Sequence, residues 1–143
     1  LAMSGRSTLA AWTTMPQEAA MAVRTRLLQP AAPMRELELG AGVQGRVDAE
    51  GFVDGFLLSW LGEDAAGAPV LRAVWLDAQL GERARIDVMR PEPGRAVGSP
   101  RLASLGAQAV LVWTEPQPPL DGRPQSRLRG VRLHLRARPA AAD

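Results

Sequence analysis

The sequence lacks cysteine, tyrosine, lysine and asparagine, and it contains a single histidine, His134. Without cysteine the chain can form no disulfide, no thiolate metal site and no cysteine nucleophile. One histidine cannot build a histidine-based zinc site, and the alternating pattern around His134 predicts a solvent-facing strand position. No phosphate-binding glycine loop and no Ser–His–Asp set is recognisable either. The sequence therefore predicts no cofactor and no metal site, and it favours a chain that is not an enzyme by itself.

All 17 basic residues are arginine, against 15 acidic residues, and Ile86 is the only isoleucine. Lysine, asparagine, tyrosine and isoleucine have AT-rich codons, so their scarcity indicates a bacterium with a GC-rich genome. The formal net charge is only +2, and locally basic sequence is confined to residues 123–138. Because a nucleic-acid footprint needs excess charge on one face, we expect no nucleic-acid partner.

The 143 residues suffice for one domain with its own core. No apolar run approaches the roughly 20 residues that a membrane-spanning helix needs. The chain opens with Leu1 and carries no signal-peptide pattern, which predicts a fragment, a processed product or a trimmed chain.

An internal repeat is the strongest signal in the sequence. Residues 1–13 align without gaps on residues 102–114, with five of thirteen positions identical, including Trp12 over Trp113. A third copy, residues 56–61, contains Trp60, and the three tryptophans are 48 and 53 residues apart. This period is typical of a four-stranded propeller blade.

A second strand with a shared valine follows each tryptophan strand, at Val23, Val74 and Val131. Residues 70–76 alternate apolar side chains on both faces, which predicts an inner strand, whereas residues 35–39 and 84–88 carry charge and are typical of outer strands. With blade strands lettered A to D from the centre, we expect the order B-C-D, A-B-C-D, A-B-C, ten strands in all. Residues 1–138 then form a single all-β repeat domain, with repeats at about 1–46, 47–97 and 98–138 and a disordered tail at 139–143. A two-sheet β-sandwich is the alternative fold.

The segments 54–62 and 98–115 resemble the repeat of bacterial sialidase-like β-propeller proteins. The resemblance implies a partial propeller of about two and a half blades, with partners that are the remaining blades or identical subunits, and a periplasmic or cell-envelope location. The family's Asp-box turn is absent, and so is the tyrosine that serves as its nucleophile. The leading hypothesis is a non-catalytic binding or scaffolding module for a glycan or cell-envelope protein ligand. A sialidase-like glycoside hydrolase with its catalytic residues in other blades, and a self-assembling structural subunit, are the alternatives.

Several residues are candidates for ligand binding or for the repeat core. Trp75 stands where the other repeats have arginine, and Arg101 and Glu115 are expected on one rim, as a functional pair or a surface ion pair. Asp48, Glu50 and Asp54 are interpreted as a solvated turn between strands. The tryptophans are interpreted as packing between blades rather than as a sugar platform. The predicted core positions are Trp12, Trp60, Trp113, Val23, Val74 and Val131.

Overall fold

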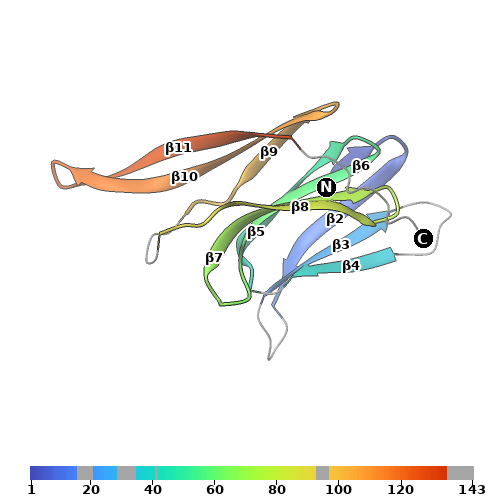
Figure 1. Cartoon of the computed structure of the whole chain (residues 1–143), viewed down its shortest axis with the longest axis horizontal. Helices are drawn as coiled ribbons and strands as arrows, with labels where there is room; N and C mark the ends of the chain where they lie inside the picture. Colours follow the sequence, from blue (N-terminus) through green and yellow to red (C-terminus); the bar gives the residue numbers. More distant parts are fainter. Residues whose placement is uncertain (16–20, 29–34, 41, 93–96, 135–143) are drawn as a thin grey trace.

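The computed structural model describes residues 1–15, 21–28, 35–40, 42–92 and 97–134. These residues form strands and turns, and eleven strands follow one another along the chain (Figure 1). They are β1 (Ala2–Ser4), β2 (Ser7–Thr14), β3 (Ala22–Leu28), β4 (Arg35–Gly40), β5 (Gln44–Phe52), β6 (Gly55–Glu63), β7 (Pro69–Asp77), β8 (Glu82–Met89), β9 (Arg101–Leu105), β10 (Gln108–Leu120) and β11 (Arg123–Leu133). The predicted all-β class is confirmed. The predicted disordered tail lies outside the described residues.

The strands form three separate antiparallel sheets, each made of consecutive strands in sequence order. We call β1–β4 the first sheet, β5–β8 the middle sheet and β9–β11 the third sheet. The prediction of ten strands was wrong by one, because Ala2–Ser4 pairs with β2 and completes the first sheet. Only the third sheet has three strands among the described residues.

The sheets stack face to face, and the middle sheet is covered on both sides. One core joins the first sheet to the middle sheet and includes Leu9, Phe56 and Trp60. A second core joins the middle sheet to the third sheet and includes Leu57, Leu111 and Trp113. Phe56 and Leu57 are neighbours in β6 and point to opposite faces, as strand geometry requires. The sheets therefore form three layers rather than the two of a sandwich. β7 is buried on both faces, as predicted for residues 70–76, and β6 is buried on both faces as well.

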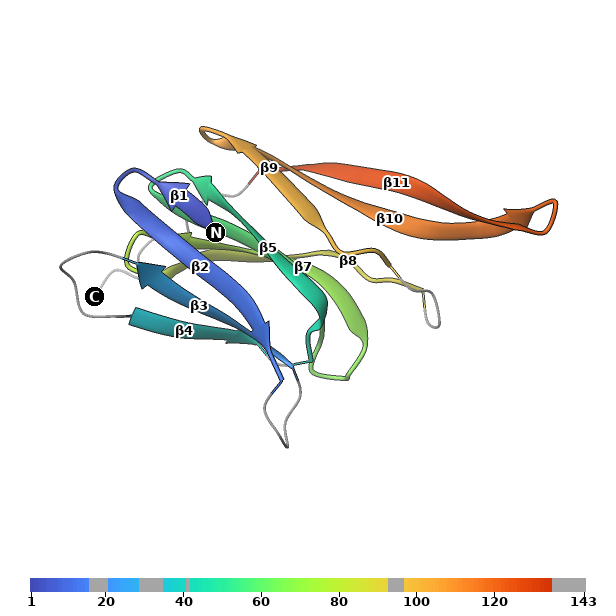
Figure 2. The same cartoon turned by 180° about the vertical axis from the view of Figure 1, so that it is seen from behind.

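The first strands of the three sheets lie next to one another, which Figure 2 shows for β1, β5 and β9. Gly51 of β5 approaches β1 so closely that a Cβ atom there would lie 1.9 Å from the Met3 carbonyl oxygen. On the other side, the Asp48 Oδ2 atom accepts a hydrogen bond of 2.7 Å from the Leu102 amide in β9. The Ser104 hydroxyl donates to the Gly51 carbonyl. Asp48 and Glu50 thus lie within a strand, and the predicted turn begins only at Val53 and Asp54.

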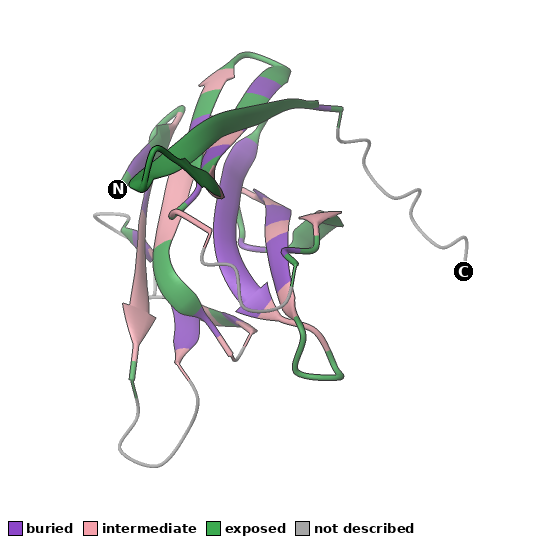
Figure 3. Ribbon diagram, turned by 90° about the vertical axis from the view of Figure 1, so that its left-hand side faces the viewer, coloured by how far each residue is buried: buried purple, intermediate pink, exposed green. Residues whose placement is uncertain are grey.

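The hairpin of β10 and β11 extends past the other sheets as an arm (Figure 1). Proline and glycine at residues 116–122 suggest a loop, but β10 continues to Leu120. Pro116 stays in register opposite Ser126, and Pro118 and Pro119 lie at a register irregularity between Gln117 and Leu120. The turn is confined to Asp121 and Gly122, whose φ angles of 50° and 74° match the turn that Asp-Gly favours in two-residue hairpins. Figure 3 shows the contrast between the buried middle strands and the exposed arm.

Candidate functional site

The three repeat tryptophans lie on the same face of their sheets, which in the middle and third sheets is the face toward the preceding sheet. Trp60 is fully buried in the core between the first and middle sheets. Trp113 is 8% exposed in the core between the middle and third sheets. Trp12 alternates with Leu9 and Ala11, which pack toward the middle sheet, so it lies on the opposite face of the first sheet, the free face, which no other described sheet covers. There it is half-buried beneath the Arg26 guanidinium, 6.0 Å from its ring centroid.

The three repeat valines are not equivalent, although the sequence aligns them. Val74 pairs with Leu58 and Val131 with Leu111, each two positions before the tryptophan, whereas Val23 pairs with Thr13, one position after it. Val23 and Val74 are fully buried, but Val131 is 36% exposed. The expectation that Val131 is a core residue is therefore wrong. Val131 lies in β11, most of which extends past the stacked sheets as part of the arm.

In each sheet the cross-strand partner of the tryptophan is an arginine. Aligning the repeats on their valines did not reveal this pairing. Trp12 pairs with Arg24, Trp60 with Arg72 and Trp113 with Arg129. In the first two sheets the row continues into the fourth strand, where a carboxylate lies opposite the arginine, at Glu38 and at Asp87. The Arg24–Glu38 contact is 3.3 Å and the Arg72–Asp87 contact is 2.9 Å. Each complete sheet thus carries one row of tryptophan, arginine and carboxylate across three strands.

In the third sheet the row stops at Arg129, because no fourth strand pairs with β11 among the described residues. Arg129 instead reaches Glu115 of its own hairpin, with its Nε atom 3.2 Å from Glu115 Oε2. The Trp113 indole N–H donates to the other Glu115 oxygen at 3.0 Å. The hydrogen bond from Trp113, followed by the hydrogen bond and the positive charge of Arg129, lowers the pKa of Glu115 below its ordinary value of 4.5. Glu115 is therefore held as an anion, which suits it to charge pairing rather than to donating a proton.

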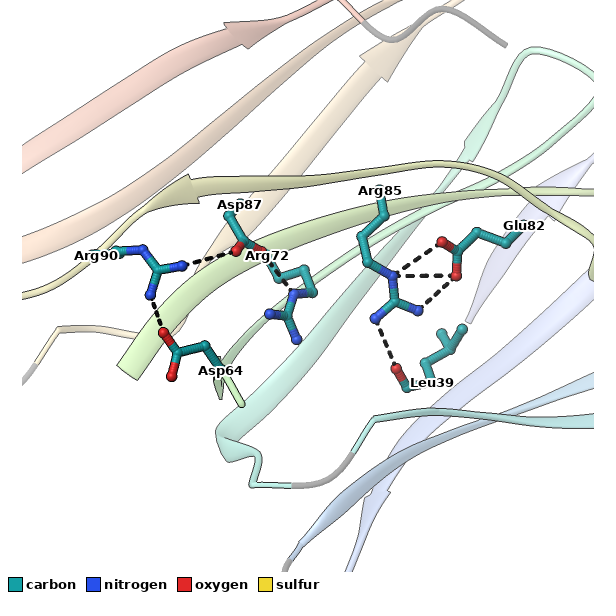
Figure 4. Close-up of polar contacts among 7 residues, drawn as sticks. All are labelled: Leu39, Asp64, Arg72, Glu82, Arg85, Asp87 and Arg90. Atoms are coloured by element: carbon teal, nitrogen blue, oxygen red, sulfur yellow. Dashed lines mark hydrogen bonds and ion pairs between the residues drawn. The ribbon is translucent and has the colours of Figure 1, made fainter. Parts of the chain in front are cut away.

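A second polar network joins the middle sheet to the hairpin tip between β6 and β7 (Figure 4). Asp87 accepts from Arg72 at 2.9 Å and from Arg90 at 3.3 Å, and Arg90 also pairs with Asp64. Asp64 accepts hydrogen bonds from the Ala66 and Ala68 amides within the tip. The Ala68 amide, together with Arg90, lowers the pKa of Asp64 below 3.8. Arg90 thus joins the tip to the end of β8.

A small pocket of about 170 Å³ lies between the end of the middle sheet and the third sheet. Its wall combines apolar and charged side chains, namely Met89, Arg90, Pro91, Glu92, Val97, Glu115 and Pro116. Glu115 and Arg90, each fixed by the contacts above, contribute opposite charges to it. The volume is below the range of about 300–1,000 Å³ typical of drug-sized sites. Among the surfaces of the described residues, this pocket is the best candidate for binding a small polar group.

The other predicted binding residues lie elsewhere. Arg101 contacts Asp48 at 3.7 Å, so the expected pairing of Arg101 with Glu115 does not form. Trp75 is partly buried in the core beside the third sheet, where its ring meets Phe52 edge-on at 5.6 Å and its indole donates to the Val53 carbonyl. Trp75 is thus a packing residue. Glu115 instead pairs with Arg129 across the β10–β11 hairpin and lines the pocket together with Arg90, and the sequence indicated neither arginine.

The described residues contain no cluster of histidine, cysteine, aspartate and glutamate that could hold a metal ion. Within the same residues, no helix has the length and apolar character to cross a membrane. Comparisons of the chain with protein-family models, curated proteins and solved structures give no match.

Proposed function

We propose that the chain is a non-catalytic binding module of the β-propeller type, in which stacked sheets hold a small polar ligand at the rim. The observation that carries the proposal is the equivalent placement of Trp12, Trp60 and Trp113. Each lies on the same face of its sheet, and Trp60 and Trp113 fill successive interfaces between sheets. A stack that repeats one interface in this way serves first as a rigid scaffold.

The pocket beside Glu115 supports the binding role. Its apolar and charged lining suits a ligand that presents both hydroxyl groups and C–H faces. A sugar of a cell-envelope glycan has this character, in keeping with the resemblance to sialidase-like repeats. Glu115 is bound by Trp113 and Arg129 and its pKa is lowered, so it can orient such a ligand but is poorly suited to act as a general acid.

The test uses the Trp113 indole N–H as an NMR reporter, because this group donates directly to Glu115 in the pocket wall. The ¹⁵N-labelled chain is titrated with peptidoglycan-derived saccharides and with a sialoside. We expect the Trp113 indole signal to shift without consumption of the sugar, while the Trp12 indole on the far face of the first sheet stays unchanged. Glu115→Gln should reduce the shift.

Turnover of a chromogenic sialoside by the same sample, abolished by Glu115→Gln, would overturn the non-catalytic assignment. Absence of any Trp113 shift with every saccharide would overturn the glycan ligand.

A further inference from the structure

We propose that the outer edge of β11 is a docking site for an acidic, extended segment of a partner polypeptide, which completes the third sheet as its fourth strand. The juxtaposition that carries this inference is the interrupted row of the third sheet. Trp113 and Arg129 are paired across β10 and β11, and no described residue occupies the position next to Arg129, which a carboxylate fills in the other two sheets. The inference does not depend on the pocket or on its ligand.

The two complete sheets define what the segment must look like. In both, the fourth strand runs antiparallel to the third and places one carboxylate opposite the arginine of the row. Leu37 and Leu39 alternate with Glu38 in β4 and pack toward the middle sheet. The segment for β11 is therefore predicted to be an extended antiparallel strand with a carboxylate opposite Arg129, and β4 is the natural template for it.

The surface of β11 fits an acidic strand and opposes a basic one. Arg123, Arg127, Arg129 and Arg132 all lie in β11, and every residue from Arg123 to Arg132 is exposed. Glu115 engages the Arg129 Nε atom, but a guanidinium has five N–H donors, so further donors remain for a second carboxylate. An exposed strand edge also offers unpaired backbone groups for strand addition.

Pairing of β11 with the same strand of a second copy is disfavoured by the same charges. Two antiparallel β11 strands would bring arginines of both copies together, and like charges opposite each other in a sheet are destabilising. An acidic strand removes this repulsion. For this reason we assign the edge to an acidic partner segment rather than to a second copy.

The test uses a capped peptide that copies residues 35–40, Arg-Glu-Leu-Glu-Leu-Gly, titrated into the ¹⁵N-labelled chain. Chemical-shift changes and amide protection are expected along β11, with Glu38 of the peptide opposite Arg129. A peptide with both glutamates replaced by glutamine is the matched control and should bind at least tenfold more weakly. Raising the salt concentration should weaken the glutamate peptide more than this control.

Charge exchange tests the register. Arg129→Glu should weaken the peptide at least tenfold, and a peptide carrying Glu38→Arg should recover most of that loss on the Arg129→Glu chain. Arg123→Glu, which changes the same charge at the hairpin tip, should weaken binding less than threefold. Arg129→Glu places a second carboxylate beside Glu115, and this repulsion can disturb the hairpin. Arg129→Ala removes the cation without that repulsion, so weaker peptide binding by this variant reports the loss of the arginine itself.

Equal weakening by Arg129→Glu and Arg123→Glu would overturn the assigned register. Absence of any peptide-induced change along β11 would overturn the docking site. Peptide-independent dimers that form through β11, detected by sedimentation, would assign the edge to a second copy and contradict the acidic partner.

Discussion

The middle sheet and the third sheet are copies of one repeat in different surroundings. Both carry a tryptophan opposite an arginine, yet Arg72 of the middle sheet is 13% exposed and Arg129 of the third sheet is 51% exposed. The middle sheet has a neighbour on each face and a fourth strand at its edge, while the third sheet has one neighbour and three described strands. The tryptophan is thus buried in both sheets, whereas the arginine opposite it is largely buried in the middle sheet and exposed in the third.

This difference separates structural from recognition roles within one repeat. Arg72 of the middle sheet is largely buried and bound to Asp87, so its contribution should appear as stability. Arg129 of the third sheet is half exposed and bound to Glu115 within the described residues, so its contribution should appear as binding.

Replacing the tryptophans should give the largest difference in stability between two repeats. Trp60→Ala leaves a cavity between two sheets and should reduce the free energy of unfolding by about 3–5 kcal/mol. Trp12→Ala, at the equivalent position on the free face, should cost less than about 1 kcal/mol. Urea unfolding followed by far-ultraviolet circular dichroism measures both. Equal losses of free energy would contradict the placement of Trp12 on an uncovered face of the first sheet.

Gly51→Ala tests the close approach of β5 and β1. The added Cβ would meet the Met3 carbonyl oxygen at 1.9 Å, so one backbone must move. We expect a loss of about 1–3 kcal/mol, in line with overpacked sites, together with large amide shifts in β1 by NMR. Ala49→Ser, two residues away in the same strand, is the control and should cost less. A Gly51→Ala chain with unchanged stability would contradict the packing of β1 against β5.

The arginines should show the same contrast at a smaller scale. Arg72→Ala removes a largely buried cation from Asp87, and charged hydrogen bonds of this kind contribute about 1.5–3 kcal/mol. Arg129→Ala breaks an exposed ion pair, worth about 0–1 kcal/mol. Thermal unfolding of the two variants should therefore shift Tm clearly for Arg72→Ala and little for Arg129→Ala. The reverse order would refute the assignment of Arg129 to recognition.

The smallest expected effect is on the pH dependence of stability. The pKa of Glu115 is lowered in the folded chain, so its stabilising contribution is present above pH 4.5 and is lost as the pH falls through the lowered folded pKa. The pKa of Asp64 is lowered as well, and its contribution disappears in the same direction below 3.8. Glu115→Gln should flatten this acid-side loss slightly. In an NMR titration the Trp113 indole should report a midpoint below 4.5; a midpoint above 4.5 would show that its bond to Glu115 does not hold in solution.

The sequence predicted the repeat and the all-β class because strand periodicity and the tryptophan spacing are local patterns. It could not predict the arginine row, since register depends on where each hairpin turns. The Asp121–Gly122 turn allows β10 to run through its prolines, whereas a loop was expected at residues 116–122. Because the hairpins differ in length, the sequence alignment also placed Val23 at the same position as Val74 and Val131, although its register differs.

The candidate site was less predictable than the fold. Glu115 was a candidate because it follows Trp113 closely in the sequence. Its partner Arg129 is brought to it by the register of β10 and β11, which the sequence does not reveal. Arg101 was expected beside Glu115, yet Asp48 of the preceding sheet attracts it. A contact between sheets of this kind leaves no periodic signal. The sequence did contain one signal for the arginine row. When the strands are aligned on their turns, an arginine falls opposite each repeat tryptophan.

Hydrogen exchange of backbone amides tests the central contrast most directly, because it reads β6 and β11 in one experiment on the unmodified chain. The account predicts that amides of β6 exchange only through global unfolding, while those of β11 beyond Arg129 toward the tip exchange through local opening, many times faster. Equal protection of the two strands, or faster exchange in β6, would contradict a buried middle sheet beside an open third one.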